Sequence, residues 1–161
     1  MDHGHPLQLP PWLTVTAAPP TTTAAPPTTT AVPPTVTVAR PGAARLEGAR
    51  AVVLAAGAAR TRVTLFGALV RLLDLPGYVG RNWDALAESL RDRLDAGPLI
   101  LVVDDATQLL ADEPVGHLGL LLTLLGDAAR DAPHPLRVVL RAAPDRVAAL
   151  RRRTTAALPR R

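Results

Sequence analysis

The sequence predicts an α/β domain in which a small three-stranded parallel sheet is covered by helices, preceded by a disordered Pro/Thr-rich tail. From about Leu46, short apolar runs alternate with longer segments whose leucines recur at helical spacing, the order that produces parallel strands joined by helices. Before that point proline, threonine and alanine dominate, and few side chains could build a core. We therefore expect a disordered extension at residues 1–45, a domain at residues 46–153 and a basic C-terminal tail at residues 154–161.

The N-terminal extension contains a repeat with paired prolines every seven residues. The sequence A-P-P-T-T-T occupies residues 18–23 and residues 25–30, and it returns in degraded form from Val32. Proline lacks the backbone N–H and cannot continue a helix, so this tract predicts an extended, polyproline-like chain and not a coiled coil.

Neither a secretory signal nor a membrane span is expected. The chain starts M-D-H-G-H-P, without the basic segment and the apolar run of a signal peptide. No apolar stretch reaches about 18 residues, the length that suggests a transmembrane helix. The chain has no cysteine, so disulfides and thiolate chemistry are excluded and a reducing compartment fits. We therefore expect a cytoplasmic protein that makes no membrane contact.

The first half of the domain predicts a strand followed by a helix. Residues 51–55 form a short apolar run that ends near Gly57, as a buried strand would. Residues 64–73 then carry leucines at helical spacing before Pro76, so the first helix lies there.

The second half predicts two more strands and two more helices. After a Gly-Pro break, the apolar run at residues 99–103 is typical of a buried parallel strand. A Leu-rich helix follows over residues 114–132, with leucines facing inward. Residues 136–140 give the third strand, and residues 144–153 form a terminal helix.

Between the first two strands lies a helix with two contrasting faces. Asn82 follows the flexible Gly80 and is a favourable N-cap, and Asp84 falls in the first turn, where a negative charge suits the helix dipole. At about 100° per residue, one stripe of this helix is apolar and consists of Trp83, Leu86, Ala87, Leu90 and Leu94. Four carboxylates gather within roughly 80° on the other side: Asp84, Glu88, Asp92 and Asp95.

Charge along the chain also favours a basic partner for this helix. Acids one turn apart repel by a few tenths of a kcal/mol, roughly, per pair, so the carboxylates contribute nothing to the helix unless a cation meets them. Between Asp74 and Asp131, 11 acids stand against four arginines, a net charge of −7, whereas the rest of the chain carries +11. A solvated helix face is the alternative interpretation for the helix taken alone.

Residues 75–90 read L-P-G-Y-V-G-R-N-W-D-A-L-A-E-S-L and resemble the signature segment of the barstar family, the intracellular protein inhibitors of barnase-type ribonucleases. The resemblance implies a barstar-like fold, a three-stranded parallel sheet with its helices, over roughly residues 46–141. It also implies that an acidic helix and loop block the basic active site of a secreted or toxin-type guanyl-specific ribonuclease, in place of RNA. We expect a monomer that forms a 1:1 complex with such an enzyme.

The resemblance assigns roles to individual residues. Tyr78 corresponds to the family's binding-loop tyrosine, Asp84 to the acid early in the helix, and Glu88 to the acid one turn later that enters the ribonuclease's phosphate site. Glu88 stands where the best-studied member has aspartate, and Ala87 where it has a tryptophan. A further acid on the later helix corresponds to Asp127. The candidate partner-binding residues are Tyr78, Gly80, Asn82, Asp84, Ala87, Glu88, Asp92 and Asp127.

Other chemistries have little support in the sequence. Asp104 and Asp105 end a strand, where open α/β sheets bind ligands, but a solvated turn is the simpler interpretation. A P-loop and the phosphoryl-transfer site of a response regulator both need a lysine, and the chain has none. His117 and His134 have no partners at ligand spacing and are expected at the surface. We therefore expect no enzyme activity, no cofactor and no metal.

Two other functions are weighed against ribonuclease inhibition. In the first, the same acidic helix makes the domain an adaptor that binds another basic protein without inhibiting a ribonuclease. In the second, the arginines at residues 151–153 and 160–161 bind nucleic acid. The chain offers no aromatic platform and no groove-reading motif, so we expect no nucleic-acid partner.

Overall fold

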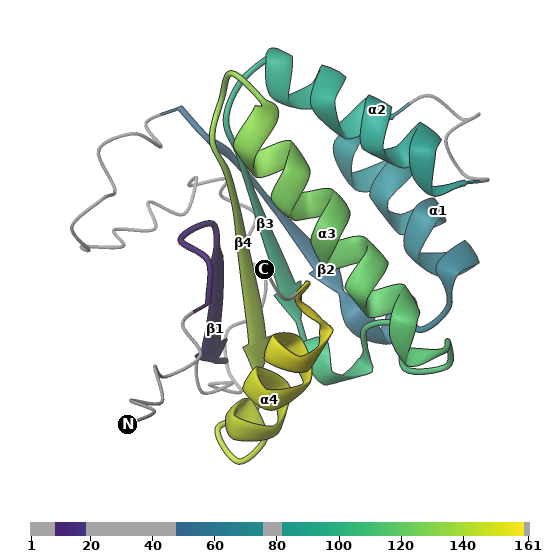
Figure 1. The fold of residues 1–161 in the computed structure, drawn as a ribbon, viewed down its shortest axis with the longest axis vertical. Helices are drawn as coiled ribbons and strands as arrows, with labels where there is room; N and C mark the ends of the chain where they lie inside the picture. Colours follow the sequence, from purple (N-terminus) through teal and green to yellow (C-terminus); the bar gives the residue numbers. More distant parts are fainter. Residues whose placement is uncertain (1–8, 19–47, 76–81, 160–161) are drawn as a thin grey trace, which may run out of the picture.

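The computed structural model of this chain describes residues 9–18, 48–75 and 82–159. These residues build two layers, a parallel sheet and a layer of helices on one of its faces (Figure 1). The elements in chain order are β1 (Leu13–Ala17), β2 (Arg50–Ala55), η2 (Ala56–Ala58), α1 (Arg62–Leu73), α2 (Trp83–Asp95), β3 (Leu99–Asp104), η4 (Ala106–Gln108), α3 (Val115–Asp131), β4 (Leu136–Ala142) and α4 (Val147–Ala157).

The strands of the sheet are all parallel and lie in the order β1-β4-β3-β2. Their register places Val53 beside Val102, Val102 beside Val139, and Val139 beside Thr14. Because successive side chains of a strand point to opposite faces, the neighbours of these residues along each strand turn into the helix layer. The predicted α/β class with a parallel sheet is confirmed.

The predicted number of strands was wrong, because β1 adds a fourth strand beside β4. β1 falls within residues 1–45, which we expected to be disordered. Leu13 and Val15 are only 3% and 5% exposed, and Leu13 pairs with Val138 of β4. The segment L-T-V-T-A alternates apolar and β-branched polar residues, which is a strand pattern. The surrounding proline and threonine concealed this pattern in the composition.

The other predicted strands and helices are present, with shifted ends. α1 begins two residues early because Thr61 is its N-cap: Thr61 Oγ1 accepts from the backbone N–H of Thr64, and Thr64 Oγ1 accepts from that of Thr61. α4 continues to Ala157, into the residues that we expected to form a basic tail. Thr154 is fully buried there, and its hydroxyl donates to the carbonyl of Leu150 at 2.7 Å.

The core lies between the sheet and the helices and is almost entirely aliphatic. Among the described aromatic residues, only Phe66 of α1 is fully buried, with 1% of its surface exposed. Leu94 of α2, Leu99 of β3 and Val138 of β4 have no exposed surface. Truncating a core leucine to alanine costs about 2–5 kcal/mol, so side chains such as Leu94 hold α2 firmly against the rest of the domain.

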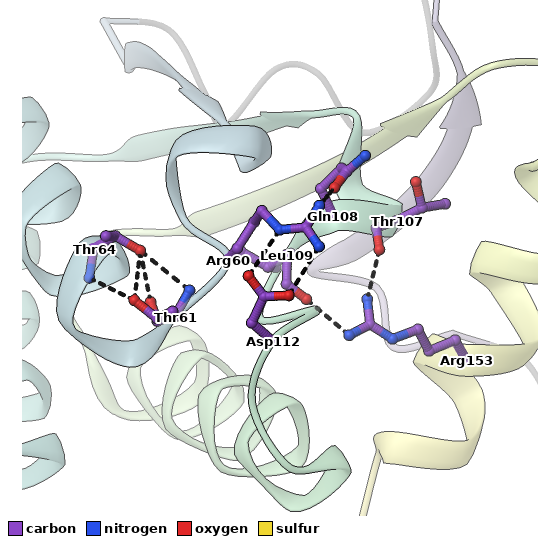
Figure 2. Close-up of polar contacts among 8 residues, drawn as sticks. All are labelled: Arg60, Thr61, Thr64, Thr107, Gln108, Leu109, Asp112 and Arg153. Atoms are coloured by element: carbon purple, nitrogen blue, oxygen red, sulfur yellow. Dashed lines mark hydrogen bonds and ion pairs between the residues drawn. The ribbon is translucent and has the colours of Figure 1, made fainter.

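At the carboxyl edge of the sheet, Arg60 joins the segment after β2 to the segment before α3. Its guanidinium donates to both carboxylate oxygens of Asp112, at 2.9 and 2.8 Å, and to Oε1 of Gln108 (Figure 2). We call these three residues the Arg60 clamp. The hydrogen bond from Arg60 lowers the pKa of Asp112 from its ordinary value, and the same bond raises the pKa of Arg60.

Arg153 connects α4 to the same edge. Its guanidinium donates to the carbonyl oxygens of Thr107 and Leu109, at 3.3 and 2.8 Å (Figure 2). Burial lowers the pKa of Arg153 from its ordinary value, but an arginine remains protonated at neutral pH. α4 is therefore part of the folded domain.

Candidate partner-binding site

The N-terminus of α2 is fixed by the cap that the sequence predicted. Asn82 has extended backbone angles, and its Oδ1 accepts a hydrogen bond of 2.7 Å from the backbone N–H of Ala85. Asp84 lies in the first turn and Arg93 in the last, and both charges suit the helix dipole. Asp84 is therefore the second residue of α2, which starts at Trp83.

The two faces of α2 differ in burial as its sequence pattern predicts. Leu86, Leu90 and Leu94 are at most 3% exposed and pack into the core, and Ser89 is buried beside them. Ala87 is partly buried at the boundary between the faces. The four carboxylates on the opposite side are all exposed, and we call them the acid ridge: Asp84, Glu88, Asp92 and Asp95.

The acid ridge carries four negative charges on one side of α2. Within the described ranges, none of its four carboxylates forms a hydrogen bond or an ion pair with another side chain. Four residues of α-helix rise by about 6 Å, so Asp84, Glu88 and Asp92 form a row with one acid per turn. The other face of the same helix is packed into the core, so this row is held in a fixed position.

Trp83 anchors the start of α2 between two other helices. Its ring meets Phe66 of α1 edge to face, with centroids 5.0 Å apart, and the ring of His117 of α3 at 6.1 Å. Trp83, which the sequence places on the apolar stripe of this helix, therefore packs against the core. The surface position expected for His117 was wrong, because its ring is partly buried beside Trp83 and its Nδ1 lies 3.2 Å from Glu113.

The family model of Barstar (barnase inhibitor) matches residues 49–141, which is more than half of the chain. The chain belongs to the barstar family. The matched span contains β2, β3, the helices α1 to α3 and all but the last residue of β4, and therefore the whole acid ridge. The strand β1 and the helix α4 lie outside the span that matches the barstar family. No curated protein sequence matches the chain.

The described candidate residues that the barstar resemblance implies lie on two neighbouring helices, α2 and α3. Asn82, Asp84, Ala87, Glu88 and Asp92 lie on or at the start of α2. Tyr78 and Gly80 lie outside the described residues, so their positions stay predictions.

Asp127 lies on a different helix from the acid ridge. It lies on α3, about 160–180° around the helix from the core residues Leu118 and Leu125 at 100° per residue. Its carboxylate, 43% exposed, is paired with Arg130 one turn later. α3 lies beside α2 in Figure 1, so both helices of the barstar domain present acids outward.

Sequence reasoning missed one residue that supports α2. His134, which follows α3 and was expected at the surface, is partly buried, and its Nδ1 donates to the carbonyl oxygen of Leu94 at 2.8 Å. The last four carbonyls of a helix lack partners within it, so this bond caps the C-terminal end of α2. No local pattern indicates it, because the two residues are 40 positions apart.

The two acids at the end of β3 have structural partners. Asp104 lies 3.4 Å from Nη1 of Arg141, and Asp105 accepts a hydrogen bond from the hydroxyl of Thr107 at 3.2 Å. Across the described part of the chain, no three His, Asp or Glu side chains are grouped as a metal site would require. Likewise, none of the helices in the described ranges is long and apolar enough to span a membrane.

Proposed function

We propose that this barstar-family protein inhibits a barnase-type ribonuclease by placing the acid ridge of α2 in the enzyme's basic active site. A ribonuclease that grips the phosphates of RNA must gather cationic side chains in its cleft. A row of carboxylates on a rigid helix can bind in that cleft because it is negatively charged, as the phosphates of RNA are. It contains no phosphodiester bond that the enzyme could cleave.

The observation that carries the proposal is the combination of exposure and rigidity in α2. Its four acids are exposed and unpaired among the described residues, while its other face is buried and its N-terminus is capped by Asn82 and packed through Trp83. Two buried charges attract each other usefully only when their geometry is well matched, because both lose water. A rigid helix meets that requirement better than a mobile loop.

Glu88 is the residue that we place at the centre of the interface. It lies in the middle of the row formed with Asp84 and Asp92, one turn from each. Its side chain is one methylene longer than aspartate and extends further from the helix. The neighbouring Ala87 is small, so we propose that contacts with the enzyme depend more on charge here than on an aromatic surface.

The test is a titration of this protein into a barnase-type ribonuclease while RNA cleavage is measured. We expect stoichiometric inhibition by the natural protein. Leaving a buried cation of the enzyme unpaired costs about 3–5 kcal/mol, so Glu88→Ala should weaken inhibition about 100-fold or more. Asp84→Ala should weaken it in the same direction.

Asp145→Ala is the matched control, because this exposed acid precedes α4 and has the same charge. It should inhibit as the natural protein does. Equal loss of inhibition in Asp145→Ala and Glu88→Ala would reject a specific role for the ridge. An absence of inhibition by the folded protein with several such enzymes would reject the proposal and favour an adaptor that binds another basic protein.

A further inference from the structure

None of the helices in the described ranges lies on the other face of the sheet (Figure 1). Val53, Val102 and Val139 lie side by side in register across β2, β3 and β4, followed by Thr14 of β1. All these side chains point away from the helix layer, since their neighbours Val52, Leu101, Val138 and Leu13 form part of the core. We call the row of Thr14, Val53, Val102 and Val139 the second face.

The second face is apolar at its centre. Val102 is only 7% exposed, although it does not belong to the core cluster and no described helix packs over it. Val53, on the edge strand β2, is 51% exposed. Parallel sheets are almost always covered on both faces, because their central strands are apolar on both sides. We therefore expect another part of the protein to pack on the second face.

The strand order points to the segment that supplies this cover. From β2 through β3 to β4 the chain moves across the sheet toward β1, and the helices of these connections lie on one face (Figure 1). The connection from β1 to β2 must move across the sheet in the opposite direction. Connections between parallel strands are right-handed in almost all proteins, so a connection with reversed direction lies on the opposite face.

We propose that residues 19–47, which connect β1 to β2, cross the second face and pack over Val102 and Val139. The connection runs from the end of β1 to the start of β2, three strand spacings across the sheet and one strand length back along it. This diagonal is about 25 Å long. An extended proline-rich chain covers about 3.1 Å per residue, so about eight residues suffice and the connection is long enough. Its proline pairs have no N–H groups, so they cover an apolar surface without leaving donors unpaired.

The first test compares thiol labelling at two adjacent residues of β3 that point to opposite faces. The natural chain has no cysteine, so Val102→Cys and Val103→Cys each carry a single thiol. Each variant is made with the natural connection and with residues 19–47 replaced by a Gly/Ser segment of equal length. We expect the replacement to speed maleimide labelling of Val102→Cys about 10-fold or more, because the thiol becomes accessible without unfolding of the domain. The labelling rate of the core position Val103→Cys should not change.

Three outcomes would overturn the proposal. Labelling of Val102→Cys at the same rate with both connections would mean that the natural segment does not cover this face. Equal acceleration at both positions would contradict the proposal, because a segment that covers only the second face protects Val102 and not the core residue Val103. Protection of Val102→Cys that is lost on dilution would assign the face to a second copy of the chain.

A second test keeps the natural connection intact. A benzophenone attached through Val53→Cys, at the edge of the second face, should crosslink to peptides from residues 19–47 of the same chain. The matched control is Val63→Cys on α1, an exposed valine on the helix side of the domain. Equal yields of these crosslinks from both positions, or none from Val53→Cys, would contradict the proposal.

Discussion

Trp83 of α2 meets Phe66 of α1 edge to face, with ring centroids 5.0 Å apart and ring planes at 83°. Phe66 is buried in the core, whereas Trp83 is partly exposed one residue before Asp84. The pair therefore couples the acid ridge to the core at the end of the helix where the ridge begins. An edge-to-face aromatic pair stabilises by about 0.5–1.5 kcal/mol beyond its buried area.

Trp83→Ala should destabilise the domain and also weaken ribonuclease inhibition. Loss of the ring removes packing against Phe66 and His117, and truncation of a buried tryptophan costs about 3–5 kcal/mol, an upper value for this partly exposed ring. Urea unfolding measures the first effect and inhibition measures the second. Trp83→Phe keeps an aromatic ring and should lose less of both. Inhibition unchanged in a destabilised Trp83→Ala protein would show that anchoring of α2 by this residue is unimportant.

Asn82→Ala should reduce stability by about 1 kcal/mol, because the first turn of α2 loses the side chain that accepts from Ala85. Asn82→Asp retains an acceptor and adds a charge that suits the helix dipole, so it should match the natural protein or exceed it. Chemical denaturation of the three proteins checks the order. A result with both variants equally destabilised would mean that the side-chain amide has another role.

Association with the ribonuclease should slow as ionic strength increases, because the acid ridge attracts the enzyme over a distance that salt screens. The Debye length shortens from about 30 Å at 0.01 M salt to about 10 Å at 0.1 M. Stopped-flow association rates across this range should fall less steeply for Glu88→Gln than for the natural protein. Asp145→Asn, with the same charge change beside α4, should retain the natural slope. Equal slopes for all three proteins would argue against steering by the ridge.

Asp112→Asn should destabilise the protein at neutral pH and have little effect in acid. The pKa of Asp112 in the folded protein lies below its ordinary value of 3.8, chiefly because of the hydrogen bond from Arg60. Such a group stabilises the fold above its ordinary pKa, and the contribution is lost as pH falls through the lower folded-state pKa. Thermal midpoints of natural and variant proteins should differ at neutral pH and converge once the pH falls below the folded-state pKa of Asp112. A difference that persists in acid would assign the effect to packing.

Most of the fold could be predicted because it follows from patterns within short segments. The leucines of α3 recur at helical spacing, and the run at β3 is apolar on both sides, so each element is visible in its own sequence. β1 was missed because five residues between proline-rich segments give too short a signal to stand out. Its partner β4 is near the other end of the chain, and no local pattern reveals that pairing.

The acid ridge was predictable for the same reason, since the spacing of Asp84, Glu88 and Asp92 alone places them on one side of a helix. The contacts that hold that helix in place could not be predicted from the sequence. The bond from His134 to Leu94 and the contact of Trp83 with His117 each join residues more than 30 positions apart. Contacts of this kind depend on how the elements pack in three dimensions.

The pairing of β1 with β4 has a consequence for the order in which the protein folds during synthesis. β1 leaves the ribosome first, but its partner β4 emerges only after nearly all of the domain. Pairing of residues so distant in sequence is slow, because a long loop must close first. The strand that is made first is therefore the last to join the sheet, and until then the edge of β4 is open to other chains.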